Sequence, residues 1–227
     1  REELHLGVSV RSFRSERQSD FVKALLDNQP EKATSIFFEL KAKFPVVVTR
    51  DLELAKNWLR HKARGNERFG IIASSGANRL RPEGINIKAK IDPKNWFLNG
   101  KEDVRSSYFL EETATEFDIQ GLELDWVCVG WDGNFRHSPS GWHYKNFSGT
   151  KWQNINDASR QLYLKNSYRV LLTRARQGMV IFVPNGSDFD KTRLKSFYDP
   201  TFNYLRSVGI PELTNIKQEA SRFSLIG

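Results

Sequence analysis

Residues 166–183 read NSYRVLLTRARQGMVIFV, a helical pattern that runs directly into a short apolar strand. Leu164, Tyr168, Leu171 and Ala175 recur at helical spacing and predict one core-facing stripe. The apolar run that follows is rich in β-branched and bulky residues, as in a strand that is buried on both faces. This helix-then-strand unit indicates an α/β fold.

The same pairing of strand and helix recurs upstream. A helical pattern over residues 52–59 follows one apolar run, and others cover residues 21–26 and 31–40, after a polar, Arg-rich opening. Short apolar runs that alternate with helices predict a parallel sheet with helices on both faces. The further strands are expected at residues 45–48, 69–73 and 126–130.

Two segments interrupt this pattern. Residues 86–107 are polar and irregular, which predicts a surface excursion. Residues 131–155 carry two clusters of turn residues with aromatics on either side, which predicts an inserted β-hairpin. We expect one α/β domain over residues 1–227, with the hairpin inserted at about 131–155.

Composition limits the class of protein. Hydrophobic residues make up 39% and charged residues 27% of the 227 residues, as in an ordinary globular domain. No apolar run approaches the roughly 20 residues of a membrane span, so no membrane partner is expected. The single cysteine, Cys128, excludes a disulfide framework and favours a buried thiol in a reducing, cytoplasmic setting. His137 and His143 lack a third ligand, so no metal site is expected.

Charge favours a polyanionic partner. Lys and Arg outnumber Asp and Glu by 35 to 27, a net charge of +8. Phosphates attract such an excess with little regard to base sequence, although many basic domains bind nothing. In residues 131–155, interleaved aromatic and basic residues suit either stacking on single-stranded bases or packing across the hairpin.

Arg174 is the first candidate for chemistry. At helical spacing it lies about 60° from the Leu171 direction, so it either reaches into a cleft or caps a solvated helix end. Residues 172–176, followed by Gly178 and a strand, resemble motif VI of superfamily 1 helicases. The resemblance implies that Arg174 is an arginine finger on the γ-phosphate of ATP and that Arg176 belongs to the nucleotide site.

Residues 115–125, TEFDIQGLELD, resemble motif V of the same superfamily. The resemblance implies that Gln120, Gly121 and Glu123 form a turn at the nucleotide, with Glu123 at the sugar. It also implies that Thr115 meets the nucleic-acid backbone. Phe117 departs from the pattern, since many relatives carry a polar residue there.

The opening gives a third, shorter match. Residues 6–16 resemble the segment around motif IV, which implies that Arg11, or alternatively Arg14, also approaches the γ-phosphate. The three motifs occur in the order expected for the second RecA-like motor domain, a parallel sheet of the P-loop NTPase type. The chain resembles the bacterial helicase-like ATPases related to the Schlafen group.

The resemblance also implies partners. No stretch matches Gly-x-x-x-x-Gly-Lys-Ser/Thr, so an N-terminal motor domain of the same polypeptide is expected to hold the ATP phosphates and Mg²⁺. Single-stranded DNA or RNA is the expected track. The alternative is an inactive relic motor domain that only binds nucleic acid or protein. The expected nucleic-acid contacts are Thr115, Ser74, Ser75, Arg79 and Arg81.

Overall fold

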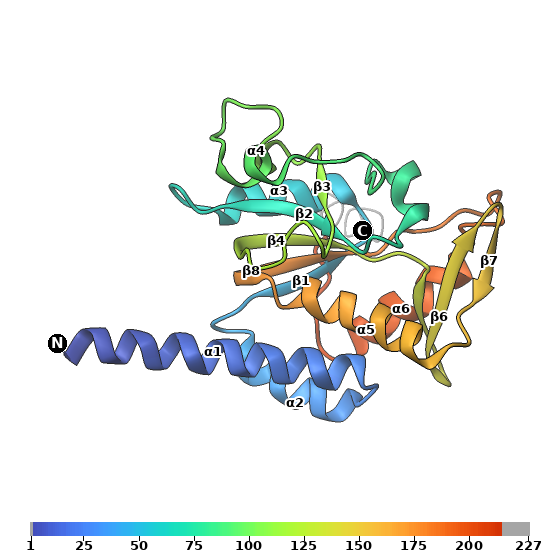
Figure 1. The fold of residues 1–227 in the computed structure, drawn as a ribbon. Helices are drawn as coiled ribbons and strands as arrows, with labels where there is room; N and C mark the ends of the chain where they lie inside the picture. The colour runs from blue at the N-terminus through green and yellow to red at the C-terminus, as the bar shows by residue number, and fades with distance from the viewer. Residues whose placement is uncertain (1, 215–227) are drawn as a thin grey trace, which may run out of the picture.

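A five-stranded parallel sheet forms the centre of the protein (Figure 1). The computed structural model describes residues 2–214, and the side chains from Phe13 onward. Within this part of the chain, the strand order is β1-β8-β4-β2-β3, and every neighbouring pair is parallel. The strands are β1 (Val46–Thr49), β2 (Phe69–Ala73), β3 (Thr113–Ala114), β4 (Leu124–Gly130) and β8 (Ala175–Phe182). This confirms the α/β class with a RecA-like sheet.

Helices cover both faces of this sheet. Along β4, Val127 and Val129 pack against one helical layer, while Cys128 packs against the other. Burial raises the pKa of the Cys128 thiol to about 12, as expected for an inert core cysteine. Figure 1 shows α1, α2, α5 and α6 on one side of the sheet and α3 on the other. The helices are α1 (Glu2–Leu26), α2 (Pro30–Leu40), α3 (Leu52–Lys62), α4 (Pro93–Leu98), α5 (Ala158–Leu172) and α6 (Lys195–Ser207), with 3₁₀ turns η1 (Asn78–Glu83) and η2 (Ser107–Phe109).

The core-facing helical stripe is one residue shorter than the sequence predicts. Leu164, Tyr168 and Leu171 are buried in α5 as expected, but Ala175 is the first residue of β8. The chain leaves the helix here because the backbone of Leu124 in β4 donates a hydrogen bond to the Arg174 carbonyl, 3.2 Å away. Pairing with β4 therefore overrides the helical pattern.

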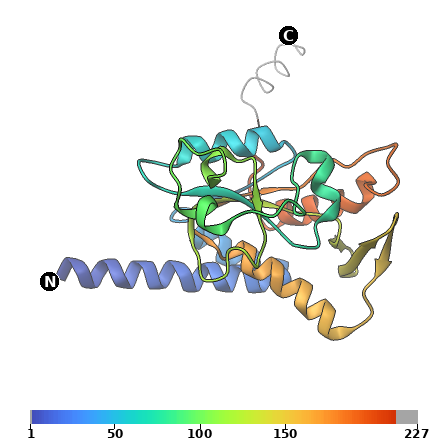
Figure 2. The same ribbon diagram turned by 45° about the horizontal axis from the view of Figure 1, so that its top comes forward.

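Two surface predictions need correction. The Arg-rich opening is helical, since α1 runs unbroken from Glu2 to Leu26 and projects beyond the sheet in both views (Figures 1 and 2). The excursion at residues 86–107 contains α4 and the start of η2, and its Trp96 is 1% exposed. Arg68 holds this segment by donating to the carbonyls of Trp96 and Asn99 at 3.1 and 2.9 Å.

The insertion forms three antiparallel strands in place of the expected two. They are β5 (Phe135–Ser138), β6 (Gly141–Ser148) and β7 (Lys151–Asn154). Phe135 and Trp142 stack with ring centroids 4.4 Å apart, and both contact Trp131. For Trp131 and Trp142, packing inside the protein is therefore observed, as one of the two possibilities predicts.

Both outer edges of the parallel sheet are short or covered. Val48 of β1 donates to Pro211 and accepts from the backbone of Leu213, at 3.0 and 2.8 Å. At the opposite edge, β3 has only two residues. Among the described residues, no helix is long and apolar enough to cross a bilayer.

Candidate functional site

The motif V and motif VI segments meet where β4 and β8 begin, an edge called here the amino edge. Both segments directly precede these neighbouring strands. The Arg174 side chain donates from Nη1 to the Leu122 carbonyl at 3.2 Å, across 52 residues of sequence. Together with the backbone bond from Leu124 to Arg174, this contact joins the two segments into one site.

Arg174 keeps unused hydrogen-bonding capacity at this site. Its side chain is half-buried, and its Nε is buried without a hydrogen-bond partner among the described residues. A guanidinium carries five N–H donors, and a buried donor without a partner costs about 1–3 kcal/mol. An anion at this edge would remove that cost.

The motif V turn exposes polar groups beside Arg174. Gln120, Gly121 and Glu123 are all exposed, and Gly121 has a φ of +79°, a conformation that favours glycine. The Glu123 carboxylate has no hydrogen bond or ion pair within the described part of the chain. Buried Ile119 anchors the turn. The edge therefore presents a free carboxylate and an amide next to a cation.

Arg176 has a different contact. It forms an ion pair with Asp125 at 2.9 Å, and Asp125 also accepts from the backbone of Arg68 at 2.8 Å. These contacts tie the first residues of β4, β8 and β2 together. The structure thus brings Arg174 and the motif V turn together. The Arg176 guanidinium instead links the neighbouring strands β4 and β8 through its ion pair with Asp125.

Helix α1 also reaches the amino edge. Gln18 donates to the carbonyls of Leu172 and Ala175 at 3.1 and 3.2 Å, on either side of Arg174. Arg14 donates to the Gln177 side chain at 3.2 Å. Arg11 lies in α1 one turn before Arg14, and its side chain is outside the described residues. Through Arg14, the motif IV segment therefore contacts the start of β8.

The predicted nucleic-acid residues lie at the opposite, carboxyl edge, where the strands end. Ser75 donates from its backbone and hydroxyl groups to Glu116 at 2.7 and 2.8 Å, which joins the end of β2 to the end of β3. Thr115 is buried and donates twice to Asp118, both at 2.7 Å. A cavity of about 210 Å³ opens here, and its lining includes Ser74, Ser75, Glu116, Lys145, Arg160 and Tyr163.

The two predicted arginines differ in their surroundings. Arg79 forms an ion pair with Asp190 at 2.8 Å and lies over the Phe147 ring. Arg81 is exposed and has no ion pair among the described residues. Of the two, Arg81 has the guanidinium that is open to solvent.

A protein-family model matches most of the chain. The family model of the Schlafen group 3 DNA/RNA helicase domain matches residues 1–185, most of the 227-residue chain. The chain belongs to this family. Comparison with curated proteins gave no match, and comparison with solved structures gave none.

The sequence did not single out every residue around the sites of this Schlafen helicase domain. Arg160, which the sequence did not indicate, reaches the cavity from the first turn of α5, and Lys145, one of the interleaved basic residues of the insertion, reaches it from β6. Exposed Phe117, which departs from motif V, stacks on cavity-lining Tyr163 with centroids 6.4 Å apart. Asp157, which caps α5 by accepting from the Arg160 backbone, was an available signal for the start of this helix.

Proposed function

We propose that this chain is the second RecA-like motor domain of an ATP-driven nucleic-acid translocase or helicase. In this proposal, Arg174 and the motif V turn complete an ATP site formed with an N-terminal motor domain of the same polypeptide. The observation that carries the proposal is the Arg174–Leu122 contact with the partnerless, buried Nε beside it.

The amino edge fits a nucleotide bound at a domain boundary. When bound, ATP supplies the phosphoryl group that is transferred to water, and Mg²⁺ would be held by the N-terminal domain. Arg174 is always charged and has a rigid fork of donors, so it suits negative charge that develops on the γ-phosphate. Arg11 is proposed as a second cation there.

The motif V turn is proposed to hold the nucleoside. Glu123 would accept hydrogen bonds from sugar hydroxyls, while Gln120 and Gly121 shape the turn beside it. Arg176 would act by holding β4 and β8 in register through Asp125. None of these groups cradles phosphates, and no Gly-x-x-x-x-Gly-Lys-Ser/Thr stretch occurs in the chain.

The carboxyl edge is proposed as the track for single-stranded DNA or RNA. Ser74, Ser75 and Thr115 surround the ends of β2 and β3, and Arg79 and Arg81 follow in η1. The net charge of +8 and the cations Lys145 and Arg160 at the cavity favour a polyanion. The two sites would then lie at opposite ends of the strands of one sheet.

The test replaces Arg174 in the full-length polypeptide that carries the phosphate-binding domain. Arg174→Ala should lower ATP turnover by about 10³-fold or more and leave ATP affinity nearly unchanged. Glu123→Ala should instead weaken ATP binding. Arg169→Ala is the matched control, because Arg169 lies in the last turn of α5, shortly before Arg174, and bonds Asn166.

Two results would overturn this assignment. A loss of less than tenfold in turnover for Arg174→Ala would make Arg174 a structural helix-end residue. Steady ATP turnover by the isolated 227-residue chain would show that a separate phosphate-binding domain is not needed. Absence of turnover in the full-length protein would favour the inactive relic.

A further inference from the structure

The loop that follows β8, residues 184–194, displays the Phe189 side chain to solvent. Phe189 is 96% exposed, more than any other large hydrophobic residue in the described part of the chain. The loop lies almost wholly beyond residue 185, where the family match ends. An aromatic ring left fully in water is an unfavourable arrangement unless something covers it.

Backbone contacts fix the loop around Phe189. The Ser187 hydroxyl accepts from the backbone N–H groups of Phe189 and Asp190, at 3.1 and 3.0 Å. The backbone of Ser187 donates to the Arg193 carbonyl at 2.7 Å, and that of Arg193 donates to Asp190 at 2.8 Å. Gly186 turns the chain at a φ of +73°, where a Cβ would lie 2.8 Å from the Arg193 oxygen.

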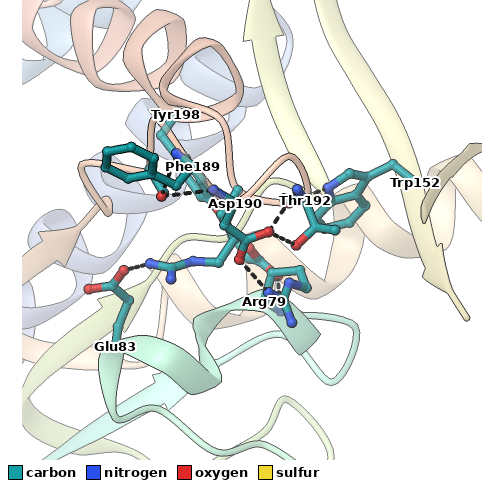
Figure 3. Close-up of polar contacts among 10 residues, drawn as sticks. Arg79, Glu83, Trp152, Phe189, Asp190, Thr192 and Tyr198 are labelled. Carbon is teal, nitrogen blue, oxygen red and sulfur yellow. Dashed lines mark hydrogen bonds and ion pairs between the residues drawn. The ribbon is translucent and has the colours of Figure 1, made fainter. Parts of the chain in front are cut away.

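Asp190 ties the loop to the body of the protein (Figure 3). One carboxylate oxygen accepts from the backbone and hydroxyl of Thr192 at 2.9 and 2.6 Å, and the other accepts from Arg79 at 2.8 Å. These hydrogen bonds, those from Thr192 foremost, hold the pKa of Asp190 below its usual range. Trp152 of β7 donates to the Thr192 carbonyl at 2.8 Å. In the view of Figure 3, the Phe189 ring lies on the opposite side of Asp190 from Trp152.

Ion pairs leave two cations of η1 and the loop without an opposite charge. The three carboxylates of the loop and η1 are each paired with a cation: Asp190 with Arg79, Glu83 with Arg193, and Asp188 with Lys195. Arg81 and Lys191 are exposed, and neither forms an ion pair with another described residue.

We propose that Phe189 is a stacking platform for a base of single-stranded nucleic acid, with Arg81 and Lys191 at the flanking phosphates; this rests on the proposed function. Stacking needs only one accessible ring face, and it tolerates every base. A loop that is already ordered loses little further freedom on binding. The two carboxylates beside Phe189 in the loop, Asp188 and Asp190, are each paired with a cation, so they offset little of the charge on Arg81 and Lys191.

The experiment measures binding of the 227-residue chain to two labelled strands of equal length, by fluorescence anisotropy at low salt. One strand is oligothymidylate and the other is an abasic strand with the same phosphates. Phe189→Ala should weaken binding to oligothymidylate by about 5- to 150-fold and leave binding to the abasic strand unchanged. Phe189→Tyr should restore binding. Phe38→Ala is the matched control, because Phe38 on α2 is 71% exposed.

Each outcome decides between the proposals. If the unaltered chain binds neither strand, the nucleic-acid part of the proposed function fails, and the stacking proposal fails with it. If it binds both and Phe189→Ala changes nothing, only the stacking proposal is overturned, and a protein partner becomes the better explanation for the loop. An equal loss on both strands, or an equal loss with Phe38→Ala, would also overturn it.

Discussion

Asp132 is a carboxylate that the fold buries almost completely, at 1% exposure. It follows the end of β4 and accepts hydrogen bonds from the backbones of Gly133 and Arg79, at 2.7 and 2.9 Å, and from the Tyr198 hydroxyl at 3.1 Å. Burial outweighs these contacts and raises the pKa of Asp132 to about 6. The residue joins β4, η1 and α6 at the carboxyl edge.

This pKa predicts how stability depends on pH. Between the ordinary value of 3.8 and about 6, the folded protein keeps a proton that the unfolded chain has lost. The stability from Asp132 is therefore present at low pH and is lost as pH rises through 6. The free energy of unfolding of Asp132→Asn, minus that of the unaltered chain, should therefore rise by roughly 3 kcal/mol from about pH 4 to pH 7. Denaturant titrations at several pH values measure this difference. If the free energies of unfolding of the two proteins changed with pH in parallel, the prediction would be contradicted.

At the scale of elements, Gly178 sets how closely β8 approaches its neighbours. A Cβ at this position would lie 2.6 Å from the Pro45 oxygen and 2.7 Å from the Trp126 ring. Pro45 also accepts a hydrogen bond from the backbone of Met179 at 3.0 Å. A side chain at residue 178 would therefore separate the starts of β1 and β8, next to the Arg174 site.

Gly178→Ala should lower the free energy of unfolding by about 1–3 kcal/mol because of this overpacking. Gly100→Ala is the control, since a Cβ there meets no atom within 4 Å and should change stability by less than about 0.5 kcal/mol. Urea unfolding followed by circular dichroism measures both. Equal effects of the two substitutions would show that the strands can move apart without cost.

Some elements of the fold could be predicted from the sequence and others could not. The runs at β1, β2, β4 and β8 were predicted because strands buried on both faces consist of continuous apolar residues. β3 was missed because two residues carry no periodic pattern. For residues 184–214, no prediction of α6 was made, and Pro200 inside that helix obscures its pattern.

The candidate sites likewise include parts that the sequence predicts and parts that it does not. The motifs around Arg174 and Gly121 could be recognised because each is a local run of sequence. The exposure of Phe189 could not be predicted, because the loop that carries it is held by side chains from separate segments, Arg79 of η1 and Trp152 of β7. Such contacts have no sequence period.

At the scale of the whole molecule, net charge predicts how nucleic-acid binding responds to salt. On a log–log plot, affinity for single strands should fall with a slope of about −0.7 for each phosphate contacted, from a dissociation constant of about 10⁻⁴ to 10⁻⁶ M. Arg81→Gln should flatten the slope by about one contact. Arg105→Gln makes the same change in charge at a distant exposed arginine paired with Asp103, and should leave the slope unchanged. Anisotropy titrations over a range of salt concentrations test both, and binding that ignores salt would refute the electrostatic track.

The two outer strands of the central sheet, β1 and β3, affect how copies of this protein meet one another. An uncovered strand edge offers a row of free backbone groups on which another chain can form a strand, and this is a route to aggregation. Here residues 211–213 occupy the outer side of β1, and β3 offers a template of only two residues. Collisions between copies of the domain therefore find little backbone to pair with along either outer strand of this sheet.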